Sequence, residues 1–233
     1  MSKKTQVRNM FNSIAGKYDF LNHFLSAGVD RRWRKKVIKI LKEQNPRSIL
    51  DVATGTADLA IAQAKLMPER IVGVDIADQM LDIGRDKIQK KGLEHLITLE
   101  NGDSESLSFR ENTFDAVTVA FGVRNFEDLE KGLAEMNRIL VPGGIAVILE
   151  FSKPQRFPVK QLYNFYFKYI LAAIGRLVSR HESAYTYLPE SVGEFPDGYD
   201  FISYMEKNGF EDCTYKTLTF GIASIYTGKK DLD

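Results

Sequence analysis

The chain has 233 residues, which suits one large domain, and hydrophobic residues make up 44% of it, so it can build a full core. Lys and Arg number 32 against 31 Asp and Glu, which excludes the strongly basic composition typical of a nucleic-acid-binding domain. One cysteine, Cys213, excludes an intrachain disulfide and favours a reducing compartment. The N-terminal residues lack the apolar run of a secretory signal, and no stretch approaches the roughly 18 to 20 apolar residues of a membrane span. We therefore expect a cytoplasmic protein, with contact to the inner face of a membrane left open.

The first two thirds of the chain predict a helical cap followed by a strand–helix alternation. Residues 1–43 read as two helices, the second with the basic run RRWRKK at 31–36. Strands are then predicted over residues 47–52, 70–74, 96–100, 114–121 and 145–151. Helices are predicted over residues 57–67, 78–91 and 127–140, the last closed by the turn Pro142-Gly143-Gly144. This alternation is typical of a parallel sheet with helices on both faces.

The last third departs from this alternation. Residues 154–204 read as an insertion that holds nearly half of the aromatic residues. Tyr163, Tyr166, Tyr169, Ile170 and Ala173 fall on one helical face, which is more often ordinary core but also suits a wall for an apolar ligand. Residues 212–228 predict a hairpin turning near Gly221, with an antiparallel strand at the sheet edge. We expect a single domain over residues 1–233, made of a cap (1–43), a core (45–151), the insertion (154–204) and the edge hairpin (212–228).

The segment from Ile49 to Asp58, ILDVATGTAD, predicts a cofactor loop. A strand ends in Asp51, small residues around Gly55 follow, and then a helix begins. Small residues let a ligand approach the backbone and the helix N-terminus. A dinucleotide would bring a pyrophosphate that Asp51 repels, whereas S-adenosylmethionine brings a sulfonium and an ammonium that Asp51 and Asp58 attract. The pattern GxGxxG of dinucleotide sites is also missing. The loop therefore favours S-adenosylmethionine over NAD, and the alternative is a tight turn without a ligand.

Two further acids follow the next two strands. Asp75 ends the second strand, where a carboxylate accepts hydrogen bonds from ribose hydroxyls in NAD and S-adenosylmethionine sites alike; its alternative role is to cap the next helix. Asp103 and Ser104 follow the third strand, where an acceptor can bind an adenine amino group; taken alone, Asp103 is more often an ordinary loop acid. Because parallel strands end at the same edge of a sheet, we expect Asp51, Asp75 and Asp103 to gather at one rim.

Longer motifs carry a family resemblance. They are MFNSIAGKYD at 10–19, FGVRN at 121–125, EFSKP at 150–154 and YTYLPES at 185–191. With these motifs the chain resembles, over nearly its whole length, the C-methyltransferases of ubiquinone and menaquinone biosynthesis. The resemblance implies a class I methyltransferase fold: a Rossmann-like α/β architecture with a seven-stranded, mostly parallel sheet, an antiparallel edge strand, N-terminal helices and a helical insertion after the fifth strand. It also implies a reduced demethylmenaquinol or polyprenyl benzoquinol substrate.

The resemblance and the loop together give a set of site residues. The predicted cofactor contacts are Asp51, Gly55, Thr56, Asp75, Asp103 and Ser104. Two departures from the family pattern stand out: Ala57 replaces a glycine found in many members, and Ala120 stands where some members have a serine. No metal site is predicted.

Three residues are predicted to act on the substrate. Ring methylation needs a nucleophilic carbon, which a quinol gains when a hydroxyl loses its proton. Arg124 is placed to hold the developing phenolate or to lower the pKa of a water, Asn125 to orient substrate or water, and Tyr18 to bind a quinol oxygen. The alternatives are a structural salt bridge for Arg124 and simple packing for Tyr18. His181 lies in a polar turn and is expected to be solvated.

Several functions and partners stay open at this point. The sequence favours a quinol C-methyltransferase, and the alternatives are a methyltransferase for another small apolar acceptor, a nicotinamide oxidoreductase and a non-catalytic quinone-binding protein on the same fold. The expected partner is a polyprenyl quinol, and no nucleic acid is expected. The basic run 31–36 suits either a solvated helix face or an anionic membrane surface. A second copy of the chain is the remaining partner left open.

Overall fold

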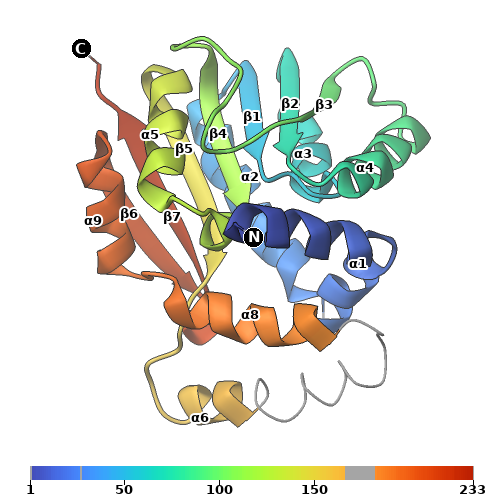
Figure 1. Cartoon of the computed structure of the whole chain (residues 1–233). Coiled ribbons are helices and arrows are strands. Elements are labelled where there is room, and N and C mark those ends of the chain that lie inside the picture. Colours follow the sequence, from blue (N-terminus) through green and yellow to red (C-terminus); the bar gives the residue numbers. More distant parts are fainter. Residues whose placement is uncertain (1, 27, 166–181, 233) are drawn as a thin grey trace.

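The protein is described from a computed structural model, which places residues 2–26, 28–165 and 182–232; the side chains of residues 17, 20–25, 164 and 182–186 are left out of the description. A seven-stranded sheet runs through the centre, with helices on both faces (Figure 1). Its strand order is β3-β2-β1-β4-β5-β7-β6. The strands are β1 (Ser48–Val52), β2 (Arg70–Asp75), β3 (Ile97–Asn101), β4 (Phe114–Ala120), β5 (Leu140–Phe151), β6 (Phe210–Leu218) and β7 (Ala223–Lys230).

The described helices join and cover these strands. They are α1 (Lys3–Leu25), α2 (Val29–Gln44), α3 (Asp58–Gln63), α4 (Asp78–Lys90), α5 (Leu129–Ile139), α6 (Val159–Phe165), α8 (Glu182–Glu194) and α9 (Tyr199–Lys207). Short 3-10 turns lie at η1 (Ala64–Leu66), η2 (Val123–Asn125) and η4 (Thr219–Gly221). Among these described helices, none is long and apolar enough to cross a membrane.

Two hydrophobic layers hold the helices to the sheet. One layer packs α2, α3 and α4 against one face, and the other packs α5 and α9 against the opposite face. Ile49 lies in the first layer and its neighbour Leu50 in the second, since successive strand residues point to opposite faces. Both side chains are fully buried. Because both faces of the central strands are covered, their sequences are continuous apolar runs. Burial of each such side chain contributes roughly 1.5 to 3 kcal/mol to stability.

The fold class expected from the sequence is confirmed, and most element boundaries agree within two residues. The helix predicted over 57–67 divides into α3 and η1. The predicted turn at Pro142-Gly143-Gly144 is wrong: these residues lie inside β5, which begins at Leu140. The pairing of β4 with β5 shifts register between Phe114 and Ala116, so an irregularity inside the ladder takes the place of a separate turn.

The predicted hairpin lies at the expected side of the sheet, but its antiparallel strand is not the outermost one. β7 runs antiparallel to both β5 and β6 and lies between them, so β6 forms the edge. The predicted insertion is also divided. Its last part forms α9, whose Phe201 and Met205 are buried in the sheet's own hydrophobic layer. Of the predicted aromatic stripe, Tyr163 lies on α6, and residues 166, 169, 170 and 173 fall outside the described residues, as does His181.

Candidate active site

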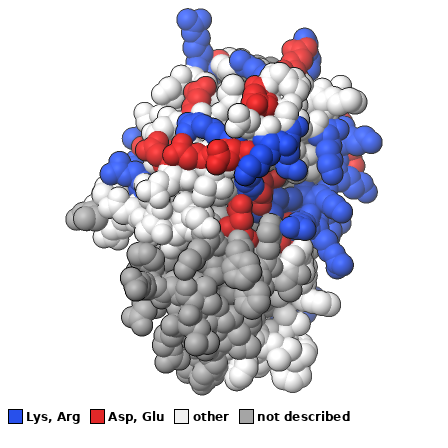
Figure 2. Space-filling view, turned by 90° about the vertical axis from the view of Figure 1, so that its right-hand side faces the viewer, with Lys and Arg blue, Asp and Glu red and all other residues white. Residues whose placement is uncertain are grey.

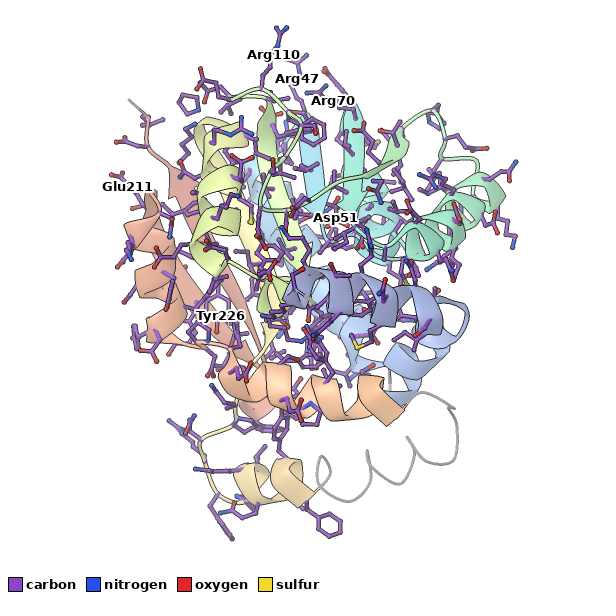
Figure 3. All side chains as sticks on the ribbon, in the orientation of Figure 1. Arg47, Asp51, Arg70, Arg110, Glu211 and Tyr226 are labelled. Atoms are coloured by element: carbon purple, nitrogen blue, oxygen red, sulfur yellow. The ribbon has the colours of Figure 1, made fainter. Side chains whose placement is uncertain are left out.

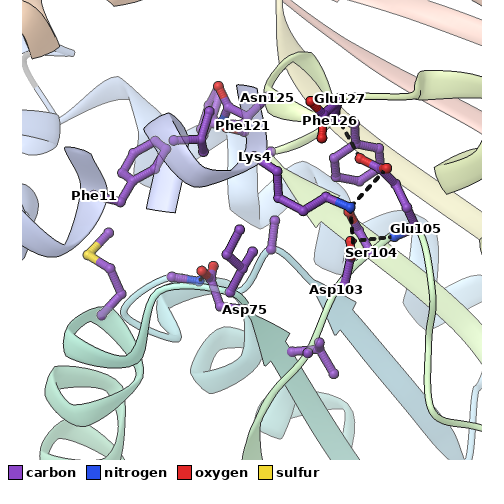
Figure 4. A pocket seen from close by; sticks show the side chains of 18 of the residues that line it. Lys4, Phe11, Asp75, Asp103, Ser104, Glu105, Phe121, Asn125, Phe126 and Glu127 are labelled. Carbon is purple, nitrogen blue, oxygen red and sulfur yellow. Dashed lines mark hydrogen bonds and ion pairs between the residues drawn. The ribbon is translucent and has the colours of Figure 1, made fainter. Parts of the chain in front are cut away.

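The carboxyl ends of the parallel strands lie next to α1 (Figure 1). Residues of α1 and of the loops after these strands line a pocket. These strand ends are the rim at which open α/β sheets bind ligands. The empty volume is about 670 Å³, its open mouth included. The lining residues come from α1, from the loops after β1 to β4 and from the start of α4; they include Lys4, Phe11, Tyr18, Gly55, Asp75, Met80, Asp103, Ser104, Glu105, Phe121, Asn125 and Glu127 (Figure 4).

The loop after β1 has a left-handed backbone at alternate residues. The φ angles are 52° at Ala53, 54° at Gly55 and 62° at Ala57. A left-handed residue with a side chain costs roughly 1 to 2 kcal/mol, so two alanines here are held by their surroundings. The N–H of Gly55 donates to the Asp75 carboxylate at 2.8 Å, which ties this loop to the end of β2. Backbone and carboxylate therefore meet at the pocket wall.

Asp75 ends β2, and Asp51 is the next-to-last residue of the neighbouring β1; their environments differ. Asp75 lines the pocket and also accepts a hydrogen bond from the N–H of Ala77 at 2.9 Å, while burial raises its pKa. Asp51 is only 1% exposed and accepts hydrogen bonds from the hydroxyls of Thr54 and Thr118, each at 2.6 Å (Figure 3). Burial raises the pKa of Asp51 to about 6, against the two threonine hydrogen bonds that lower it. Asp51 is therefore buried next to the pocket and does not line it.

The first turn of α1 brings a cation to the third acid. Lys4 Nζ lies 2.5 Å from the Asp103 carboxylate and 3.1 Å from that of Glu105 (Figure 4). The hydrogen bond with Asp103 raises the pKa of Lys4. Glu105 in turn accepts a hydrogen bond from the N–H of Glu127 at 2.8 Å. Asp103 therefore has an ion-pair partner in this structure, supplied by the N-terminal helix 99 residues away in the sequence.

The C-terminal half of α1 is fastened to the β1 loop as well. The hydroxyl of Thr56 donates to Asp19 at 2.5 Å. Lys87 Nζ on α4 lies 2.8 Å from Asp19 and 2.6 Å from Asp58. Polar contacts therefore hold α1 across the pocket at both ends. Between them, the rings of Phe11 and Tyr18 meet edge to face with centroids 5.8 Å apart.

The turn after β4 carries a buried ion pair. Arg124 Nη1 lies 2.7 Å from Glu150 Oε1 on β5, and the side chains are 6% and 0% exposed. Burial raises the pKa of Glu150 and the neighbouring Arg124 opposes that shift. Arg124 Nη1 also donates to the carbonyl of Phe121 at 2.5 Å; Phe121 is left-handed, with φ of 61°. A Cβ at Gly122 would lie 2.5 Å from that of Ala53, so this turn requires a glycine.

Asn125 is the residue of this turn that lines the pocket. Its Nδ2 donates to the carbonyl of Phe121 at 3.4 Å, and its Oδ1 accepts from the hydroxyl of Tyr187 on α8 at 2.9 Å. Burial raises the pKa of Tyr187, so its hydroxyl stays protonated and is the donor. The side chain of Asn125 is thus held from two sides.

Comparison with known proteins gives the family. A model of the ubiE/COQ5 methyltransferase family matches residues 1–230. The chain belongs to this family. A demethylmenaquinone methyltransferase of Bacteroides fragilis is 49% identical over 229 residues, covering 98% of this chain and 94% of that protein. A ubiquinone/menaquinone biosynthesis C-methyltransferase UbiE of Geobacter sulfurreducens is 48% identical over 232 residues, covering 99% and 90%.

Solved structures share the fold at low sequence identity. An S-adenosylmethionine-dependent methyltransferase of Thermotoga maritima, described as a possible histamine N-methyltransferase, superposes with a TM-score of 0.69 at 17% identity, covering 96% of this chain and 99% of that one. A phosphoethanolamine N-methyltransferase of Haemonchus contortus gives a TM-score of 0.62 at 15% identity, covering 91% and 59%. At these identities the likeness establishes the class I methyltransferase fold and no more.

S-adenosylmethionine is the methyl donor of this ubiE/COQ5 methyltransferase, and the pocket fits its charge. Asp75, Asp103, Glu105 and Glu127 line the pocket together with one lysine, Lys4. An acidic lining favours a ligand with a sulfonium and an ammonium over one with a pyrophosphate. Within the part of the chain that the structure describes, no cluster of three or more His, Cys, Asp and Glu side chains is arranged to hold a metal ion.

The structure brings most of the predicted site residues of this methyltransferase to one pocket. Those in its lining are Tyr18, Gly55, Asp75, Asp103, Ser104 and Asn125. Asp51 is buried next to the pocket and bonds Thr54, and Thr56 donates its hydroxyl to Asp19. Arg124 forms a salt bridge with Glu150, which was the alternative to a role on the substrate. Their roles toward cofactor and substrate stay predictions.

Sequence reasoning missed four residues of the site. Lys4, Glu105 and Glu127 line the pocket, and Tyr187 binds Asn125. Glu105 follows Asp103 by two residues and could have been found as part of the same acidic loop. Lys4 and Tyr187 reach the site through long-range contacts, and no local pattern marks Lys4. The YTYLPES motif at 185–191 was the only available signal for Tyr187.

Proposed function

We propose that this methyltransferase transfers the methyl group of S-adenosylmethionine to a ring carbon of demethylmenaquinol, and that a polyprenyl benzoquinol is a second acceptor. The observation that carries the proposal is the near full-length identity of 49% and 48% to proteins named for these activities. The pocket supports it, because Asn125 of the FGVRN motif and Tyr18 line the same cavity as the acids at the strand ends.

The cofactor roles proposed for the acids follow from their positions. Asp75, at the end of the second strand, would accept hydrogen bonds from the ribose hydroxyls. Asp103 and Ser104 would face the adenine of the cofactor. Gly55 would let the methionine part of the cofactor approach the backbone closely. Asp51 would act through its charge from beside the pocket. When bound, the cofactor supplies an electrophilic methyl group on a sulfonium.

The remaining chemistry falls to the chain's own side chains. A quinol carbon becomes nucleophilic when the adjacent hydroxyl is deprotonated, so the site must favour a phenolate. Asn125 and Tyr18 would hydrogen-bond the substrate oxygen. Arg124 would act from behind the pocket wall, because its Nη1 binds Glu150 and the Phe121 carbonyl and its side chain does not line the pocket. Alignment of carbon and methyl contributes several kcal/mol more in enzymes of this kind.

Methyl transfer from labelled donor tests this proposal. Purified protein is incubated anaerobically with S-adenosylmethionine labelled in its methyl group and with either demethylmenaquinol or a demethylated polyprenyl benzoquinol. We expect label in the naphthoquinol product, and label in the benzoquinol product if that second acceptor is also used. Absence of label in both products, with cofactor binding intact, contradicts the proposal and favours a quinone-binding role or another acceptor.

A first variant tests the proposed adenine contact. Lys4→Met should tighten S-adenosylmethionine binding about two- to fivefold, because Lys4 now competes for the Asp103 carboxylate and a partly exposed ion pair contributes little. Calorimetric titration of wild type, Lys4→Met and Arg8→Met measures the effect. Arg8 is exposed on the same helix and serves as the matched control. Weaker binding in Lys4→Met would show that the lysine supports the pocket instead of competing for it.

We also propose that α2 contacts an anionic membrane surface, where a polyprenyl quinol is dissolved. Its exposed face carries the basic residues Arg31, Arg32, Lys35, Lys36, Lys39 and Lys42. Lys and Arg side chains also gather along the right-hand side of the face shown in Figure 2. Each basic residue near such a surface contributes roughly 1 kcal/mol.

Vesicle sedimentation tests the membrane proposal. The protein should bind phosphatidylglycerol vesicles but not phosphatidylcholine vesicles, and salt should weaken the binding. Lys35→Glu/Lys36→Glu should lose it, whereas the control Lys90→Glu/Lys91→Glu, exposed on and just after α4, should keep it. Equal binding of both double variants would contradict a role for α2. Light scattering on the same protein without vesicles tests whether two copies of the chain associate.

A further inference from the structure

We propose that Tyr187 is a positioning residue that fixes the direction of the Asn125 side-chain amide, so that Asn125 presents an N–H donor to the oxygen of the methyl acceptor. The inference rests on the proposed function, in which that oxygen becomes anionic. It concerns a residue of α8, far from the strand ends in sequence, that does not line the pocket and bonds the lining residue Asn125.

An asparagine amide has two faces of opposite character. Its oxygen accepts hydrogen bonds and its nitrogen donates them, so a half-turn about the last side-chain bond exchanges donor for acceptor. At the wall of a pocket this choice matters, since an amide oxygen facing an anionic substrate oxygen would repel it. A site that stabilises a phenolate therefore needs the amide held in one direction.

The contacts of Asn125 give that direction. Tyr187 donates its hydroxyl hydrogen to Oδ1 at 2.9 Å, which satisfies the oxygen. Nδ2 points the other way and donates one hydrogen to the carbonyl of Phe121 at 3.4 Å. An amide nitrogen carries two hydrogens, so the second remains for a ligand at the pocket wall that Asn125 lines.

The protonated hydroxyl of Tyr187 and the carbonyl of Phe121 together make the arrangement one-directional. The side chain is half-buried, and burial raises the pKa of its hydroxyl, so it donates across the working pH range. A hydroxyl also has acceptor lone pairs, and a flipped Asn125 could donate to them. The flip would however turn Oδ1 toward the Phe121 carbonyl oxygen, with two acceptors facing each other. Tyr187 and the left-handed Phe121 thus act together to select one amide orientation.

The neighbouring ion pair favours the same geometry. Arg124 donates to the same Phe121 carbonyl, and Glu150 holds Arg124 in place. The carbonyl that receives the Asn125 N–H is therefore itself fixed by a buried charge pair. Tyr187 supplies the remaining constraint, and it is the one that can be removed by deleting a single oxygen atom.

Tyr187→Phe tests the inference, with Tyr199→Phe as the matched control. Tyr199 is an exposed tyrosine on α9 whose ring contacts Tyr215. We expect kcat for quinol methylation to fall about tenfold or more in Tyr187→Phe, less than the roughly hundredfold loss of an oxyanion donor itself, because Tyr187 acts through Asn125. The dissociation constant of S-adenosylmethionine and the thermal midpoint should stay near wild type, and Tyr199→Phe should match wild type throughout.

Two further readouts separate positioning from general support. The apparent pKa in the kcat–pH profile should rise in Tyr187→Phe, because the phenolate loses a donor. A double-mutant cycle with Asn125→Ala should be non-additive: once the amide is absent, Tyr187→Phe should lower kcat no further. This cycle keeps the inference testable even if Tyr187→Phe is somewhat less stable.

The results distinguish a failure of this inference from a failure of the proposed function. An active wild type with unchanged kcat in Tyr187→Phe, or with additive losses in the cycle, overturns the inference and leaves the proposed function standing. A wild type that binds S-adenosylmethionine but labels neither quinol contradicts the proposed function itself. Loss of cofactor binding in Tyr187→Phe also overturns the inference, since it assigns Tyr187 to the cofactor side of the pocket.

Discussion

Asp51→Asn will weaken S-adenosylmethionine binding about tenfold or more at pH 8 while leaving the fold intact. The wild-type carboxylate is 1% exposed and lies next to the pocket, where a charge is poorly screened. A tenfold loss corresponds to about 1.4 kcal/mol, a modest value for a charge acting on a cation at an effective dielectric constant near 20. Asparagine keeps the shape and can still bond Thr54 and Thr118. Calorimetric titration of wild type and variant gives the comparison.

The same variant should remove a pH dependence. Burial raises the pKa of Asp51 to about 6, so wild-type affinity for the cationic cofactor should fall as the pH drops through about 6 and the carboxylate takes up a proton. Asp51→Asn cannot titrate, and its binding should lack this fall between pH 7 and pH 5. A wild-type affinity that is constant over this range would contradict a role for the Asp51 charge.

The stability of Asp51→Asn should change in the opposite sense from its binding. The folded-state pKa of about 6 lies above the ordinary value of 3.8, so the proton binds more tightly to the folded state. The stability gained from this tighter proton binding is fully present below pH 3.8, and it is lost as the pH rises through about 6. At pH 8 the neutral asparagine avoids the cost of a buried charge, so urea unfolding should show equal or greater stability. A clear loss of stability at pH 8 would contradict this account.

Arg124→Met will lower the free energy of unfolding by about 3 to 5 kcal/mol, because it leaves the Glu150 carboxylate buried without its cation. Activity will also be lost, but that loss alone says nothing about catalysis. The double variant Arg124→Met/Glu150→Gln removes both charges, and its glutamine oxygen can still accept the N–H of Phe151. We expect it to regain most of the stability in urea unfolding.

The double variant separates the two roles of Arg124. If the guanidinium supports a phenolate from behind the pocket wall, the refolded double variant should bind S-adenosylmethionine normally and still methylate quinol at least a hundredfold more slowly than wild type. The Glu150→Gln single variant, which keeps the guanidinium, serves as the control. A double variant with near wild-type kcat would mean that Arg124 serves the structure alone.

The parallel core and the acidic rim could be predicted from the sequence because both depend on local patterns. Asp51 and Asp75 each end an apolar run, and parallel strands bring such ends together without further information. The helices and strands from residue 45 onward follow their own periodicity in the same way. The loop sequence did not reveal the backbone conformation at Ala57, where φ is 62°. Glycine adopts such a positive φ without strain, which explains the glycine that other members carry at this position.

The pairing of side chains could not be predicted, because it depends on contacts between distant segments. Arg124, after β4, meets Glu150 on the adjacent β5 over a separation of 26 residues, and Lys4 meets Asp103 over a separation of 99. The same limit explains the sheet edge. A hairpin at 212–228 is a local feature, but which of its strands joins β5 is decided by packing, and the second one does.

That placement has a consequence for how the protein is made. β7 is the last described strand along the chain, yet it fills the gap between β5 and β6. Until it emerges from the ribosome, β5 presents an unpaired backbone rim next to the finished part of the sheet, and such rims recruit other chains. The strand that carries Glu150 therefore stays unpaired on its β7 side until β7 has been synthesised. Premature termination before residue 223 would leave a fragment that lacks β7 and is prone to aggregate. A fusion placed shortly after Lys230 would be attached directly to β7, the strand that completes the sheet.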